Sequence, residues 1–267
     1  VALGTVRRVV PAMLLPGQLH LVGRLNGPWQ NARFDGLAEH MAPNQAMSRL
    51  LGAVRLDTRR EVLGVEMDAT FDRLSFDALR SGYPSLTPHG GLTGRIVTRG
   101  SLESLWLDAD VTGDLGTIRA LGTITAMDPR WAADSLDLTF SRVDLDALLG
   151  KGGSTALNGR MRLHGAIDSL VPPDGSVVMD LDRSRVGGLT FDQATLRLGA
   201  AAGMLQVDSA EVRWPEGQIS GRGAIGWAVP DSGSLHLEAW AASLQPFDSL
   251  LRAATGIVRD TLAPRTL

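Results

Sequence analysis

The stretch Leu136-Asp137-Leu138-Thr139-Phe140 alternates strictly between apolar and polar residues. A period of two places the apolar side chains on one face of an extended strand and the polar ones on the other. An amphipathic α-helix would instead repeat apolar residues at i, i+3, i+4 and i+7, a pattern that this strict alternation does not follow. The same alternation recurs at 65–71, 105–112, 177–182, 205–208 and 235–239. The sequence therefore predicts many strands that are apolar on one face only.

Turn-forming residues separate these alternating runs at short intervals, for example Gly90-Gly91, the segment 172–175 and the segment 230–233. No long helical pattern lies between consecutive strands, which argues against a crossover α/β architecture. Glycine is frequent, with 31 residues, and aromatic residues make up only 5% of the chain. This composition favours an all-β fold with many turns and thin packing.

Composition also limits the classes of function. The chain has 267 residues, of which 44% are hydrophobic and 21% charged, and this balance is typical of a folded protein. Its formal net charge is −3, and no basic stripe is interleaved with aromatic residues, so we expect no nucleic-acid partner. The absence of cysteine excludes disulfides, thiolate metal sites and cysteine nucleophiles, and it is compatible with an oxidising compartment.

The sequence contains no recognisable motif for catalysis or metal binding. The five histidines have no metal-ligand spacing, and no Gly-x-Ser-x-Gly elbow occurs. Gly150-Lys151-Gly152-Gly153 lacks the spacing of a phosphate loop, and pairs such as Asp108 and Asp110 lack the loop pattern of a calcium site. The six tryptophans are spread along the chain, which favours edge or rim positions over a stacking platform. We expect a non-enzymatic protein with no catalytic residue, no metal and no cofactor.

Short phrases recur along the chain. The segment 71–79 resembles 140–148, with a looser copy at 243–250, and 92–100 matches 157–165. Such repeats predict a quasi-linear stack, here one elongated repetitive β region over 1–267 with weak units near 16–90, 91–156 and 157–250. The Asp-Ala-Leu phrase in the first two copies is interpreted as a short helical turn or β-corner, with its aspartate (Asp77 or Asp146) as a local cap.

The two termini carry further expectations. Apolar residues at helical spacing predict a terminal helix over 247–262, ended before Pro264 and packed over a sheet edge. The chain begins at Val1 and shows neither a signal peptide nor an apolar run of transmembrane length. We interpret it as excised from a longer chain, with any membrane anchor outside this segment.

Two motifs resemble the AsmA/TamB family of bacterial envelope proteins. The first is an apolar-x-apolar-Asp-Ala-Leu phrase followed by a glycine-framed strand, at Leu145 to Gly165. The second is a strand, a small turn and a Gly-x-Gly return strand, at Ala210 to Ile225. The resemblance implies an elongated, strongly curved antiparallel sheet (a β-taco or half-pipe) with an apolar inner face and one or two short helices. It also implies a periplasmic, inner-membrane-anchored protein that carries phospholipid toward the outer membrane.

A curved sheet of one-faced strands exposes an apolar surface that either closes on itself or holds an apolar guest. We expect the apolar strand positions to line one continuous lipid groove for phospholipid acyl chains, at Val65, Met67, Phe71, Leu105, Leu107, Val111, Leu136, Leu138, Phe140, Val177, Met179, Leu181, Leu196, Leu198, Leu205, Val207, Leu235 and Leu237.

Two alternatives remain open. One is a scaffold or chaperone segment that offers strand edges to outer-membrane protein chains by β-augmentation, with an outer-membrane barrel protein as a partner. The other is a closed structural β domain of a surface protein. An open apolar groove favours the lipid conduit, an unprotected sheet edge favours the scaffold, and a filled interior favours the closed domain.

Overall fold

The computed structural model describes residues 15–84, 86–127, 130–150, 154–168, 174–226 and 233–242. Within these ranges the protein is all-β, with sixteen strands in one antiparallel sheet that does not close into a barrel and two short helices. The predicted all-β, antiparallel class is therefore confirmed. The predicted helix over 247–262 and the looser repeat at 243–250 lie outside the described residues.

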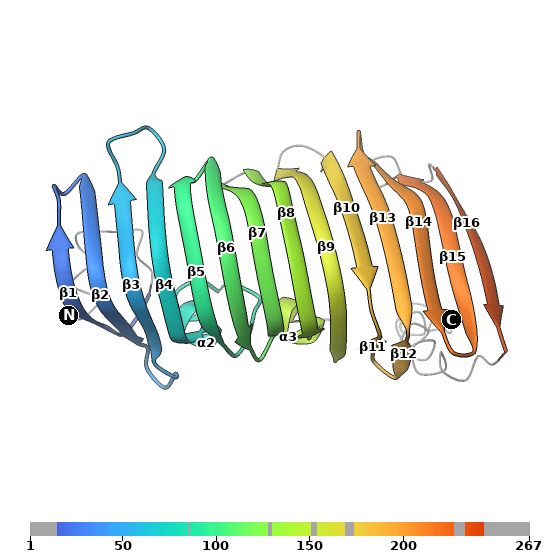
Figure 1. Cartoon of the computed structure of the whole chain (residues 1–267), viewed down its shortest axis with the longest axis horizontal. Coiled ribbons are helices and arrows are strands. Elements are labelled where there is room, and N and C mark those ends of the chain that lie inside the picture. Colours follow the sequence, from blue (N-terminus) through green and yellow to red (C-terminus); the bar gives the residue numbers. More distant parts are fainter. Residues whose placement is uncertain are drawn as a thin grey trace, which may run out of the picture.

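The sheet is a meander in which each strand pairs with its neighbours in the sequence (Figure 1). Its strands in spatial order are β1 (Gln18–Asn26), β2 (Asn31–Met41), β3 (Ser48–Asp57), β4 (Gly64–Ser75), β5 (Gly91–Ser101), β6 (Ser104–Gly113), β7 (Gly116–Met127), β8 (Arg130–Val143), β9 (Thr155–Asp168), β10 (Asp174–Leu181), β13 (Gln193–Ala201), β14 (Met204–Trp214), β15 (Gly217–Gly226) and β16 (Gly233–Ala241).

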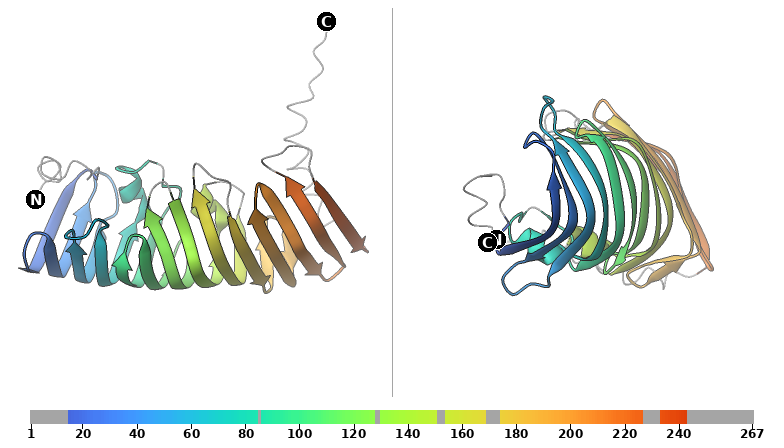
Figure 2. Two further views of the ribbon diagram at one scale, coloured as in Figure 1. Left: turned by 90° about the horizontal axis from the view of Figure 1, so that it is seen from above. Right: turned by 60° about the vertical axis from the view of Figure 1, so that its left-hand side comes forward.

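A small hairpin interrupts this order between β10 and β13. It consists of β11 (Ser184–Val186) and β12 (Leu189–Phe191), and β11 also pairs with the beginning of β9. Figure 2 shows the stack from two further sides, and the strand ribbons bow between their ends in the right-hand view. The ladders contain register shifts, for example between Phe71 and Leu74 and between Ala133 and Leu136, and a bulge generally bends its strand.

Register divides the sheet into two faces, since directly paired residues point to the same side. On one side, Leu136 pairs with Leu163, Leu163 with Val177, and Val177 with Leu198. On the other side, the neighbouring position Asp137 pairs with Arg162. The pairings keep these two sets of residues on separate sides of the sheet from β1 to β16. We call the side of Leu136 the apolar face and the side of Asp137 the polar face.

Two helices interrupt the meander at the Asp-Ala-Leu phrases. They are α2 (Phe76–Arg80) and α3 (Leu145–Leu149), so the interpretation of these phrases as short helical turns is correct. The predicted caps are wrong, because the N-cap residues are Ser75 and Asp144, each two residues before the expected aspartate. Their side chains accept hydrogen bonds from backbone N–H groups inside the first turn, the position at which capping works. Asp77 and Asp146 lie within that turn instead.

Candidate functional site

Every residue predicted to line the groove lies on the apolar face. The pairings that join them run from β4 to β16, for example Val111 with Ile118, Leu138 with Met161, and Gly221 with Leu237. Their exposure varies along the sheet. Phe71, Leu105, Val111, Leu181 and Val207 are buried, Leu235 and Leu237 on β16 are exposed, and the remaining predicted residues are half-buried.

The helices α2 and α3 and the β11–β12 hairpin cover the apolar face at one end of the strands. The β11–β12 hairpin contributes Phe191 to a buried cluster with Val143, Leu157 and Trp214. Toward the N-terminal half, Leu92 and Leu115 form a second buried cluster against which residues of α2 and α3 pack. We call this side of the apolar face the capped edge. It runs along the strand ends that meet α2, α3 and the hairpin, and it is not an edge strand of the sheet.

Hydrogen bonds tie the covering segments to one another. The backbone N–H of His89, in the segment after α2, donates to the carbonyl of Ala147 in α3 (2.9 Å), and the Thr87 hydroxyl donates to the carbonyl of Leu148 (3.0 Å). At the start of α3, the Asp144 carboxylate also accepts from the backbone N–H of Thr155 (3.1 Å). The segment after α2, the helix α3 and the start of β9 are thus connected to one another at the capped edge.

The opposite ends of the strands are much more open, and we call this side the bare edge. Leu25, Leu56, Trp131 and Ile225 lie there on the apolar face with 70%, 43%, 56% and 44% of their surface exposed. Leu105 at the same edge is buried, between Gly100 and Ile124. Water therefore reaches the apolar face from this side, as it also does at Leu21 and Leu237 on the first and last strands.

A pocket of about 350 Å³ lies on the apolar face beside the bare edge. Its floor is a row of small residues that pair in sequence across four strands, namely Ala133, Gly165, Gly175 and Ala200. The adjacent row of Leu136, Leu163, Val177 and Leu198 forms an aliphatic wall, and Trp131 lies at the pocket. The hollow thus exists because four small residues adjoin four larger ones in register.

The two glycines in this floor are required by the backbone. A Cβ atom at Gly165 would lie 2.3 Å from the carbonyl oxygen of Asp174, and one at Gly175 would lie 2.3 Å from that of His164. Both glycines also have positive φ angles, +140° and +153°, which other residues rarely adopt. The same two residues therefore set the strand geometry and keep the pocket floor low.

The polar face carries ion pairs between neighbouring strands. Arg162 donates to Asp137 (2.7 Å), Arg160 to Asp180 (3.2 Å), and Arg95 donates two hydrogen bonds to Asp68 (2.9 and 2.8 Å). The Arg95 side chain lowers the pKa of Asp68 below its usual range. These exposed pairs add little stability individually, but a shift of one residue would turn these charges toward the apolar face.

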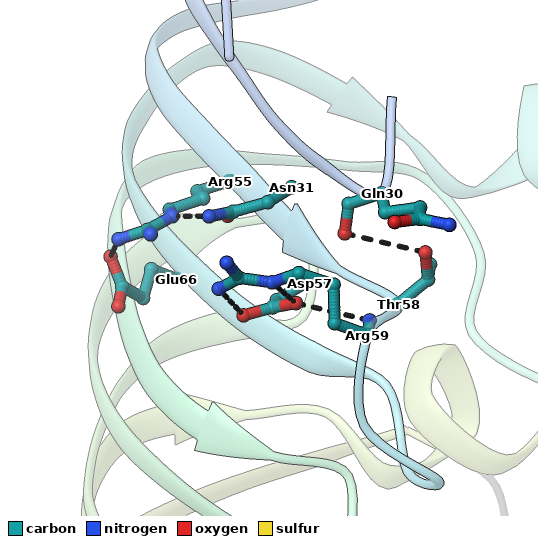
Figure 3. A network of polar contacts seen from close by, with 7 residues as sticks. All are labelled: Gln30, Asn31, Arg55, Asp57, Thr58, Arg59 and Glu66. Atoms are coloured by element: carbon teal, nitrogen blue, oxygen red, sulfur yellow. Dashed lines mark hydrogen bonds and ion pairs between the residues drawn. The ribbon is translucent and has the colours of Figure 1, made fainter. Parts of the chain in front are cut away.

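A polar network holds the corner between the β1–β2 turn and the β3–β4 loop (Figure 3). The backbone N–H of Thr58 donates to the carbonyl of Gln30 (2.8 Å), and Arg55 donates to the Asn31 side chain (2.7 Å). Asp57 lies against Arg59, whose side chain and backbone N–H both donate to it and hold the pKa of Asp57 well below its usual range. The network fixes loop geometry and brings together no catalytic constellation.

Over the described ranges no cluster of three or more His, Asp or Glu side chains could hold a metal ion. In the same part of the chain no helix is long and apolar enough to cross a membrane. His164 and His236 lie on the polar face, opposite Ser176 and Arg222, as their sequence positions predict.

No protein-family model, curated protein or solved structure matches this chain. The sequence alone did not predict the pocket or the capped edge of the apolar face. The small residues of the pocket floor are visible in the sequence, but their alignment in one row depends on pairing between strands, which the sequence does not give directly.

Proposed function

We propose that this chain is a segment of an AsmA/TamB-like periplasmic protein that carries phospholipid along its apolar face between the inner and outer membranes. The observation that carries the proposal is the continuity of that face. Paired apolar positions follow one another from β1 to β16, and most of the predicted groove residues are only half-buried. A contiguous, partly exposed apolar face of this kind commonly marks a site for a guest or a partner.

The proposed sheet is a strongly curved half-pipe with the apolar face inside. Support comes from the bulges, which bend their strands, and from α2, α3 and the β11–β12 hairpin, which all pack on the apolar face. Each CH₂ of an acyl chain that leaves water on such a surface contributes about 0.8 kcal/mol. Because neighbouring strands offer similar aliphatic contacts, a chain can exchange one set for the next without a large barrier.

The polar face fits the same proposal, as does the lack of catalytic constellations among the residues that the structure describes. A carrier needs an outer surface that stays in water, and the Arg–Asp pairs of the polar face provide one. It needs no nucleophile, general base, metal or cofactor, and we assign none. The partners of the proposed protein are phospholipid acyl chains and an outer-membrane barrel protein, with a membrane anchor outside this segment and no nucleic acid.

Photo-crosslinking at two adjacent positions tests the proposal. A photoreactive residue at Leu138 samples the apolar face, and one at Asp137 samples the polar face of the same strand. In cells, phospholipid adducts are expected at position 138 and not at position 137. Equal labelling at both positions, or none at position 138 in a folded protein, contradicts a lipid-carrying face.

A second candidate is the scaffold that pairs with outer-membrane protein chains by β-augmentation. The observation that favours it is β16, which is exposed from Gly233 to Trp240 and pairs with β15 at one end of the described sheet. An added strand would bond to the backbone of β16 rather than contact the apolar face. Crosslinks from β16 to unfolded barrel proteins, with no lipid adduct at Leu138, would select this function instead.

A further inference from the structure

The two long edges of the apolar face differ in their contact with water. At the capped edge, Val143, Leu157 and Trp214 are buried under the small elements, with 6 to 8% of their surface exposed. At the bare edge, Trp131 and Ile225 remain about half exposed. A charged lipid headgroup cannot be accommodated among the buried side chains of the capped edge without losing its hydration. A lipid whose headgroup stays hydrated therefore reaches the face across the bare edge or along the sheet from its exposed first and last strands, and not across the capped edge.

The pocket beside Trp131 has the chemistry of a hydrocarbon site. Its floor and wall are formed by glycine, alanine, leucine and valine residues of the apolar face. His164 and Asp174 border the pocket, but register places them on the polar face, where His164 pairs with Ser176 and Asp174 with Ala166. No charged side chain of the apolar face lines the pocket, so a flexible hydrocarbon chain fits it better than a polar ligand.

We propose that this pocket is an entry subsite, which takes one acyl chain of a phospholipid from the bare edge and leaves the polar end of the lipid at that edge beside Trp131. The inference rests on the proposed function and adds where the lipid enters and in which orientation. Tryptophan suits such a position in general, because its large ring can contact hydrocarbon while its indole N–H stays hydrated, as at membrane interfaces.

Fluorescence quenching by brominated lipids tests the subsite. In one variant Trp131 is the sole tryptophan, and in a matched variant Trp106, on the polar face opposite Thr123, is the sole one. The others are replaced by phenylalanine, and far-ultraviolet circular dichroism verifies the fold. Phosphatidylglycerol with brominated acyl chains should quench Trp131 strongly and leave Trp106 nearly unchanged. Equal quenching of the two overturns the subsite.

A variant that fills the pocket tests the subsite without any tryptophan replacement. Ala200→Leu puts a larger side chain on the pocket floor, and Ala224→Leu adds the same atoms on the polar face, where Ala224 pairs with Gln206. Loss of contact with about two CH₂ groups should weaken phosphatidylglycerol binding roughly tenfold for the first variant. The second variant should bind as the wild type does, and equal binding by both variants overturns the subsite.

The outcomes separate this inference from the proposed function. If the wild-type protein binds no phospholipid at all, the proposed function fails. If it binds phospholipid but Trp131 is quenched no more than Trp106, the entry subsite fails and the carrier function stands. If a brominated free fatty acid quenches Trp131 and the brominated phospholipid does not, the pocket takes a different ligand and the inference is overturned.

Discussion

Replacing Leu138 by aspartate distinguishes an open apolar face from a closed core. Leu138 is half-buried on β8, between Ala120 and Met161 in register. Full burial of a leucine side chain contributes about 1.5–3 kcal/mol, so half of it is about 1 kcal/mol. The poorer strand propensity of aspartate adds up to ~1 kcal/mol. If water can hydrate the new carboxylate, the free energy of unfolding should fall by only about 2 kcal/mol.

Two matched variants calibrate this value. Leu181→Asp puts the same charge into the buried cluster beside Phe191, where it cannot be hydrated, and should cost more than ~4 kcal/mol. Val178→Asp lies on the polar face between Arg162 and Arg197, so it keeps the propensity cost but gains two cationic neighbours. It should change stability by less than ~1 kcal/mol.

The assay is urea unfolding followed by far-ultraviolet circular dichroism, combined with phospholipid binding by each folded variant. We expect Leu138→Asp to remain folded and to lose lipid binding, while Val178→Asp keeps both properties. A loss of stability in Leu138→Asp as large as that in Leu181→Asp would refute the open face, and the closed structural domain would then be the better account.

Further predictions concern local features. Asp68 has a lowered pKa in the folded state through Arg95, so its stabilising effect is complete above the unfolded pKa of about 3.9 and is lost as the pH falls toward the folded value. In Asp68→Asn the melting temperature should therefore fall less steeply than in the wild type as the pH drops below about 4. An unchanged pH dependence would argue against the Asp68–Arg95 ion pair. Gly165→Ala should cost more than ~2 kcal/mol, because its Cβ would meet backbone; a smaller loss in chemical denaturation contradicts the tight strand approach. Asp144→Ala should cost about 1 kcal/mol as the α3 cap, and Asp146→Ala clearly less; equal losses in the same assay would contradict the cap assignment.

The sequence predicts the strands well because the intervening residues are charged. In 135–140, a shift of one residue would bring Asp137 to the apolar face, so both the strand and its orientation follow from the alternation. The residues predicted to line the groove share one face for the same reason. The predicted N-caps, Asp77 and Asp146, lie two residues after the actual ones. The repeated Asp-Ala-Leu phrase marks the first turn of each helix, whereas the caps Ser75 and Asp144 precede that phrase.

Features that depend on contacts between distant segments were beyond the sequence alone. The β11–β12 hairpin covers the apolar face through Phe191, yet its short strands show no long alternation. The pocket needs Gly165 opposite Gly175 and Ala200 beside them, which is a matter of pairing rather than of local pattern. The difference between the capped and bare edges likewise appears only when the helices are placed on the sheet.

Native mass spectrometry of the protein purified from bacterial cells tests the central claim most directly. The account predicts masses above that of the 28.4 kDa chain by one or more phospholipids, which dissociate on activation and are identified in the released fraction. Leu138→Asp should lose these adducts, whereas Val178→Asp should keep them. A folded wild-type protein that carries no phospholipid, both as purified and after incubation with phosphatidylglycerol vesicles, would contradict the claim that this sheet is a lipid carrier.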